Sequence, residues 1–136
     1  MSKRVLFVCI GNSCRSQMAE AFARVYGSDV LTASSAGLSP ASIVVPQTVA
    51  ALREKNIGTE GHFPKHLDSV LHEPFDIVVN MSGFPLSFPG ARMVEWNVPD
   101  PIGQGDKFFR AVANQIENLT MHLILELRRT AATGSR

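Results

Sequence analysis

The stretch that decides the fold lies near the start of the chain and reads Val5-Leu6-Phe7-Val8-Cys9-Ile10-Gly11-Asn12-Ser13-Cys14-Arg15-Ser16. Residues 3–8 form a short apolar run with the length of a buried strand. Gly11 and Asn12 interrupt the run, and from Arg15 onward apolar residues recur at helical spacing: Met18, Ala21, Phe22 and Val25. The sequence therefore predicts a strand, a tight loop and a helix that ends at Gly27.

The rest of the chain repeats this alternation. Apolar patterns predict strands over 30–36, 75–81 and 93–98, and helices over 46–56, 67–71 and 108–129, with a frayed tail over 130–136. Strands that alternate with helices favour an α/β sandwich with a mostly parallel sheet. With 136 residues, we expect a single domain over 1–136.

Composition and charge narrow the function classes. Hydrophobic residues make up 45% and the net charge is +1, with no basic run or acidic tail, so we expect neither nucleic acid nor a membrane as partner. No apolar stretch approaches the roughly 20 residues of a membrane span or resembles a signal peptide, which favours a cytoplasmic protein. The two cysteines, Cys9 and Cys14, form no disulfide framework. Without a histidine cluster beside them, they predict no metal site.

The loop from Cys9 to Ser16 has the chemistry of an anion site. It follows a predicted strand and opens a helix, the place where open α/β sheets bind ligands and where unpaired N–H groups attract anions. Arg15 adds a planar fork for two oxygens. A positive environment stabilises a thiolate, so we expect Cys9 to be a nucleophile that attacks an anionic tetrahedral centre. The alternative is a buried cysteine that only packs. The predicted oxyanion-binding residues are Ile10, Gly11, Asn12, Ser13, Cys14, Arg15 and Ser16.

The segment from Val8 to Glu20, with Cys9-x5-Arg15-Ser16 inside it, resembles the signature of the low-molecular-weight protein-tyrosine phosphatases. Thioredoxin-coupled arsenate reductases share that fold and loop. The resemblance implies a Rossmann-like three-layer sandwich with a four-stranded parallel sheet, the phosphotyrosine protein phosphatase I fold.

The resemblance also implies roles for single residues. The general acid of the family falls on Asp100 of Asp100-Pro101, the serine that holds the thiolate on Ser16, and the asparagine that shapes the loop on Asn12. Ser35, in Ser35-Ala36-Gly37, and His62 match supporting residues. Taken from the residues alone, Asp100-Pro101 indicates a simple turn rather than an acid, and His62 is equally an exposed loop histidine.

Two departures bear on the substrate. Eukaryotic members of the family carry aromatic residues after Asp-Pro, whereas Ile102 and Gly103 stand there, so strict phosphotyrosine specificity is not expected. The 100–105 loop and the first loop lie closer to the arsenate reductases. Classical reductases, however, place two resolving cysteines after the third strand, and residues 79–85 contain none. Ser82 stands near the first of those positions.

The leading hypothesis is a cofactor-free phosphatase that hydrolyses phosphate monoesters, phosphoproteins among them, through a phosphocysteine on Cys9, with Arg15 as clamp and Asp100 as acid. The alternative is an arsenate reductase that uses Cys9 and an external thiol, without an intramolecular cysteine relay. A third hypothesis, a carrier that only holds phosphate, has no use for Asp100. Cys14 is either a redox partner of Cys9 or inert packing.

Overall fold

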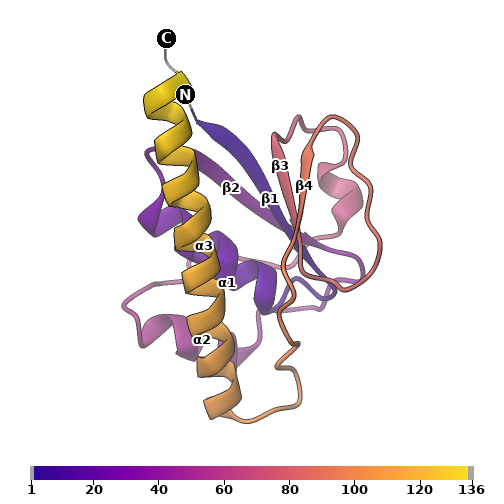
Figure 1. Ribbon diagram of the computed structural model, residues 1–136. Helices are drawn as coiled ribbons and strands as arrows, with labels where there is room; N and C mark the ends of the chain where they lie inside the picture. Colours follow the sequence, from indigo (N-terminus) through magenta and orange to yellow (C-terminus); the bar gives the residue numbers. More distant parts are fainter. Residues whose placement is uncertain (1, 135–136) are drawn as a thin grey trace.

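The computed structural model describes residues 2–134. Four parallel strands form one sheet in the order β2-β1-β3-β4: β1 (Lys3–Cys9), β2 (Leu31–Gly37), β3 (Ile77–Asn80) and β4 (Arg92–Glu95). The predicted α/β class and parallel sheet are confirmed. Figure 1 shows the strands side by side behind the long C-terminal helix.

Both later strands are shorter than predicted, for local reasons. The side chain of Asp76 accepts the backbone N–H of Arg4 at 2.8 Å, and the regular ladder of β3 begins at Ile77, two residues after the predicted start. Beyond β4, the Trp96 N–H still bonds to the Asn80 carbonyl at 3.0 Å. The chain then leaves the sheet and carries Val98 toward the loop that follows β1.

The helices fall on opposite sides of the sheet. Helices α1 (Arg15–Tyr26), α2 (Pro46–Arg53) and α3 (Asp106–Gly134) cover one face, and a 3₁₀ helix, η1 (Leu67–Val70), covers the other (Figure 1). Alternate residues of β1 serve both cores: Phe7 packs toward α1 and α3, whereas Leu6 packs toward η1. The result is three layers, of which the one built by η1 and its neighbouring loops is thin.

Helix α3 extends beyond its predicted end. A frayed tail was expected from residue 130, but the helix continues to Gly134, and residues 135–136 lie outside the described part of the chain. Ala131 and Ala132 are strong helix formers, and the Thr130 hydroxyl bonds back to the Glu126 carbonyl at 3.0 Å. The apolar stripe ends earlier than the helix because the last turns have no sheet to cover.

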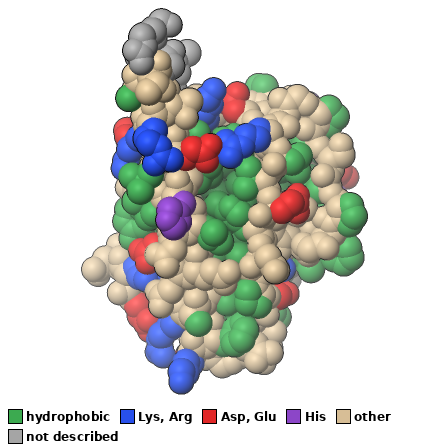
Figure 2. Space-filling view, viewed as in Figure 1, with side chains coloured by type: hydrophobic (Ala, Val, Ile, Leu, Met, Phe, Trp, Pro, Cys, Tyr) green, Lys and Arg blue, Asp and Glu red, His purple; other side chains and the backbone are tan. Residues whose placement is uncertain are grey.

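The face drawn in Figure 2 shows hydrophobic side chains gathered in the furrow between α3 and the edge of the sheet, with basic and acidic side chains side by side across its upper end. One pair that joins these two elements is Arg92 of β4 with Glu126 of α3, at 2.7 Å. Among the described residues, no helix is long and apolar enough to span a membrane.

The strand order places a ligand site at the end of β1. The chain leaves β1 toward β2 on one side and returns to β3 on the other, so β1 is the point where the order reverses. In open parallel sheets, the carboxyl ends of the strands at such a point form a crevice for ligands. The residues that follow Cys9 occupy that position.

Candidate active site

The loop over residues 10–14 turns its carbonyl groups outward. Each carbonyl from residue 9 to residue 14 accepts a hydrogen bond from outside the loop. Backbone amides of residues 38–45 supply four of these bonds, at 2.8–3.2 Å: Leu38 to Cys9, Ser39 to Ile10, Ala41 to Gly11 and Val45 to Ser13. Gln17 Nε2 donates to the Asn12 carbonyl at 3.0 Å, and the backbone N–H of Met18 donates to the Cys14 carbonyl at 2.8 Å.

The amides of the same loop consequently face the other way. In a trans peptide the carbonyl of one residue and the N–H of the next point in opposite directions. Outward carbonyls at 9–13 therefore turn the N–H groups of residues 10–14 inward, and these find no acceptor among residues 2–134. Asn12 adopts a left-handed backbone conformation, with φ of 49°, that closes the curve. Together with the start of α1, these donors form a concave anion-binding nest.

Cys9 lies beside this nest with its sulfur in a directed hydrogen bond. Its Sγ is 2.8 Å from Ser16 Oγ, and Asn12 Nδ2 donates to the same Oγ at 2.7 Å. The Asn12 side chain has only one orientation, because its Oδ1 must accept the backbone N–H of Lys65, at 2.9 Å. Since Ser16 Oγ accepts from Asn12, its own proton is free to point at Cys9, the arrangement that suits a thiolate.

His62 is connected to the loop through the side chain of Gln17. The Gln17 amide nitrogen donates to the carbonyls of Asn12 and Phe63, both at 3.0 Å, so its Oε1 faces His62 Nδ1 at 3.0 Å. The Nδ1 atom must therefore carry the proton. Burial lowers the pKa of His62, helped by the neighbouring positive charges of Arg24 and Lys65, which favours the neutral ring.

Ser35 is tied to helix α1. Its hydroxyl donates to Glu20 Oε1 at 2.5 Å, and the buried Glu20 carboxylate also pairs with Arg24 one turn further on. Neither Ser35 nor His62 contacts Cys9 directly. Each fixes a neighbour of the loop, and the predicted supporting roles of both stay predictions.

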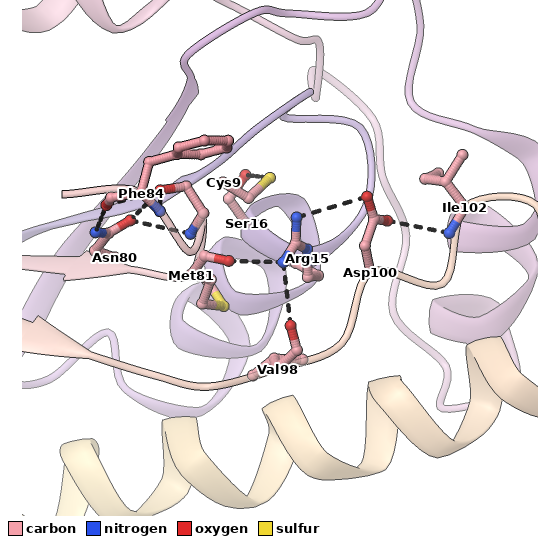
Figure 3. A network of polar contacts seen from close by, with 10 residues as sticks. Cys9, Arg15, Ser16, Asn80, Met81, Phe84, Val98, Asp100 and Ile102 are labelled. Carbon is pink, nitrogen blue, oxygen red and sulfur yellow. Dashed lines mark hydrogen bonds and ion pairs between the residues drawn. The ribbon is translucent and has the colours of Figure 1, made fainter. Parts of the chain in front are cut away.

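Arg15 is buried, with 5% of its surface exposed, and its guanidinium is held by backbone oxygens. Its NH1 nitrogen donates to the Met81 carbonyl at 2.6 Å and to the Val98 carbonyl at 3.1 Å, as Figure 3 shows. Asp100 Oδ2 lies 3.7 Å from the NH2 nitrogen, and Asp100 Oδ1 accepts the N–H of Ile102 at 3.1 Å. A carboxylate at the mouth thus faces the clamp.

A cavity of about 280 Å³ opens above the loop, with Cys9, Arg15 and Asp100 on its wall. The other side chains around it are small or aliphatic, among them Ala41, Val45 and Ile102. Among residues 2–134, no aromatic side chain lines the cavity, in keeping with the expectation that a phenyl ring has no dedicated wall here. The cavity therefore suits a small oxyanion and leaves the space above it to a flexible or aliphatic group.

The second cysteine of the loop, Cys14, is buried. Burial, together with the neighbouring Cys9 and Asp100, raises the pKa of Cys14 from 9.0 to about 12, which favours its protonated thiol. Both cysteines are free.

The structure brings most of the predicted site residues to one cavity. Cys9, Arg15 and Asp100 line it together with Ile10, Gly11, Ser13 and Cys14, whereas Asn12 and Ser16 join the site through the hydrogen bonds that lead to Cys9 Sγ. Gln17, which ties His62 to the loop, was not singled out, although a buried amide in the first turn of an amphipathic helix is a usable signal. Among residues 2–134, no group of three or more His, Cys, Asp or Glu side chains could hold a metal ion.

Comparisons with known proteins agree with this geometry. Residues 4–85, more than half of the chain, match the family described as low molecular weight phosphotyrosine protein phosphatase. A glutaredoxin arsenate reductase from Synechocystis sp. is 32% identical over 130 residues, which covers 92% of this chain and 98% of that protein.

Two solved structures extend the comparison. An arsenate reductase in the phosphate binding state superimposes with a TM-score of 0.84 at 32% identity, over 92% of this chain and 98% of the other. An arginine phosphatase from Geobacillus stearothermophilus has a TM-score of 0.84 at 25% identity, over 96% of each chain.

Proposed function

The chain belongs to the low molecular weight phosphotyrosine protein phosphatase family, and we propose that within this family it is an arsenate reductase whose Cys9 adduct is resolved by a thiol from outside the chain. The observation that carries the proposal is Cys9 beside an oxyanion nest, in a chain whose relatives are named arsenate reductases. The sequence by itself favours a phosphatase, whereas the names of the relatives favour an arsenate reductase.

The first step uses the geometry of the loop. The inward amides of residues 10–14 and the Arg15 fork bind the arsenate oxygens. The Cys9 thiolate attacks arsenic, and the departing oxygen leaves as water after it takes a proton, for which the Asp100 carboxyl at the mouth is the nearest acid. The product is an arsenic(V) ester of the Cys9 sulfur.

The second step requires a thiol that the loop does not supply. Burial favours the protonated thiol of Cys14, and Ser82 stands near the position where classical arsenate reductases place their first resolving cysteine. An external thiolate attacks Cys9 Sγ, the sulfur–arsenic bond breaks, and its electron pair reduces arsenic to the trivalent state, released as arsenite. A second thiol then attacks the mixed disulfide and frees Cys9. Two thiols become one disulfide per arsenate reduced.

The source of that thiol follows from the compartment and from the cavity. The reaction consumes reduced thiols, which favours the cytoplasm, where glutathione and thioredoxin keep thiols reduced. The side chains of Ala41, Val45 and Ile102 on the cavity wall are uncharged, and the carboxylate on the same wall, Asp100, faces the guanidinium of Arg15 at 3.7 Å. A relative that is 32% identical is named a glutaredoxin arsenate reductase. Glutathione with a glutaredoxin is therefore the first pair to test.

The experiment measures arsenite formation from arsenate with glutathione plus glutaredoxin, and separately with thioredoxin and its reductase. We expect turnover with the glutathione system and none in Cys9→Ser. Aryl phosphate hydrolysis is assayed in the same preparation. Absence of arsenite with every thiol system, together with Cys9-dependent phosphate release, would overturn the proposal.

Phosphate monoester hydrolysis is the second candidate, because Asp100 stands where an acid for an ester leaving group is needed and an arginine phosphatase shares the fold. In that reaction Asp100 first protonates the leaving alkoxide and then deprotonates water. Asp100→Asn should slow esters with poor leaving groups far more than esters with good ones. An equal loss for both kinds of ester would remove Asp100 from the acid role.

A further inference from the structure

The turn that follows β3 is closed by the side chain of one buried residue, Asn80. Its Oδ1 accepts hydrogen bonds from Ser82 N at 3.0 Å and Ser82 Oγ at 2.7 Å. Its Nδ2 donates to the Phe84 carbonyl at 2.8 Å and to Glu95 Oε1 at 3.1 Å. An amide side chain has two donors and two acceptor positions, so all four are used. We call this set, Asn80 with Ser82, Phe84 and Glu95, the Asn80 clasp; Figure 3 shows its Asn80 and Phe84.

Two further hydrogen bonds hold the Asn80 clasp in place. The Ser82 hydroxyl, which donates to Asn80, also accepts the N–H of Phe84 at 3.1 Å. The Asn80 carbonyl accepts the N–H of Trp96, next to Glu95 in β4, at 3.0 Å. Because Asn80 is only 1% exposed, water does not replace a lost partner easily, and each broken bond leaves a buried group unpaired.

The residue enclosed by the clasp is a direct partner of the clamp. Met81 stands between Asn80 and Ser82, and its carbonyl receives the shortest hydrogen bond of Arg15, at 2.6 Å. The second anchor of Arg15, the Val98 carbonyl at 3.1 Å, lies on the segment that leaves β4. A guanidinium presents its donors in a fixed plane, so a shift of the Met81 carbonyl rotates the fork away from the oxyanion.

We propose that Asn80 is a positioning residue for Arg15: it fixes the Met81 carbonyl and thereby aims the guanidinium at the oxyanion held above Cys9. The inference uses the proposed function only in taking Arg15 as the oxyanion clamp. It also assigns a role to the segment where the resemblance places resolving cysteines. In this chain that segment is a fixed support for Arg15, and the Ser82 hydroxyl is engaged inside it.

The test is a double-mutant cycle read out by phosphate binding. Inorganic phosphate is titrated against the reduced protein, and its occupancy is measured as protection of Cys9 from alkylation by iodoacetamide, which works at weak affinities. The four proteins are wild type, Asn80→Ala, Arg15→Lys and the double variant. Lysine keeps a positive charge but needs no alignment by the Met81 carbonyl.

We expect Asn80→Ala to lower the affinity for phosphate about tenfold when Arg15 is present and less than twofold in the Arg15→Lys background. A loss of the same size in both backgrounds, or no loss with Arg15 present, would overturn the proposal. If Asn80→Ala fails to fold, Ser82→Ala takes its place in the cycle, because it removes two bonds of the clasp and leaves Asn80 paired with Phe84 and Glu95.

A matched control separates positioning from stability. Ile116→Val trims a fully buried core side chain of α3 that does not line the oxyanion cavity, and it should lower the melting temperature without weakening phosphate binding. If it weakens phosphate as much as Asn80→Ala does, the effect is loss of stability and the positioning role is wrong. Phosphate binding uses neither arsenate nor a thiol, so the cycle remains informative whether or not arsenate is reduced.

Discussion

The replacement Gly37→Ala tests how closely the oxyanion loop is packed against the neighbouring strand. Gly37 ends β2 in register with Cys9, and the loop crosses directly over it. A Cβ atom at this position would lie 2.6 Å from the Ile10 carbonyl oxygen and 2.9 Å from the backbone nitrogen of Asn12. Both neighbours are main-chain atoms, so no flexible side chain can move aside.

The size of the effect follows from these distances. Ordinary contact begins at 3.4 Å, so the Ile10 carbonyl would have to retreat by about 0.8 Å. Displacements near 1 Å in a reacting site cost up to ~100-fold in rate, so we expect catalytic efficiency to fall 10- to 100-fold and phosphate to bind correspondingly more weakly. Overpacking costs about 1–3 kcal/mol of unfolding free energy, which for a chain of this length lowers Tm by roughly 3–12 °C.

The assay compares Gly37→Ala with Gly27→Ala. At Gly27 a Cβ would lie 2.7 Å from Ile124, in the α1–α3 contact, so this variant is also overpacked but far from the loop. Phosphate protection of Cys9 and thermal unfolding are measured on both. Both variants should have a lower melting temperature, and only Gly37→Ala should bind phosphate more weakly. Phosphate binding within twofold of wild type in Gly37→Ala, or an equal loss in Gly27→Ala, would refute the reasoning.

Three further predictions concern single side chains. Ser16→Ala removes the hydroxyl 2.8 Å from Cys9 Sγ and should slow alkylation of Cys9 at pH 7.5 about tenfold, because a charge-assisted hydrogen bond is lost; an unchanged rate would contradict the directed bond. Because the pKa of Cys14 is raised to about 12, iodoacetamide at pH 7.5 should label Cys9 and leave Cys14 unlabelled, as mass spectrometry of the peptides can test. Burial lowers the pKa of His62 in the folded chain below its unfolded value of 6.5, so the unfolded chain binds the proton more readily. The contribution of the neutral His62 ring to the free energy of unfolding is therefore complete above pH 6.5 and is lost as the pH falls below 6.5. Between pH 7.5 and 5.5 the urea midpoint should therefore fall more in wild type than in His62→Gln, and parallel curves would rule this out.

Much of the fold could be read from local patterns. The apolar runs located every strand, and the helical spacing from Met18 to Val25 located α1. The ends of the elements were less readable, because they depend on partners elsewhere. The ladder of β3 starts at Ile77 because the Asp76 carboxylate accepts a backbone N–H of β1, and α3 continues past its apolar stripe through residues such as Ala131 that have a high helix propensity.

The candidate site also has features that the sequence indicates and features that only the tertiary structure decides. The seven residues from Cys9 to Arg15 by themselves predicted a nucleophile, an anion-binding nest and a clamp, because the loop and the helix start are contiguous in the sequence and the side chains of Cys9 and Arg15 indicate their chemistry. The tertiary structure alone decided how that nest is held and aimed. Amides of residues 38–45 turn the loop carbonyls outward, and the carbonyls of Met81 and Val98 orient Arg15. These partners are main-chain groups that every residue carries, so no residue type marks them, and only the fold that brings distant segments together makes them specific.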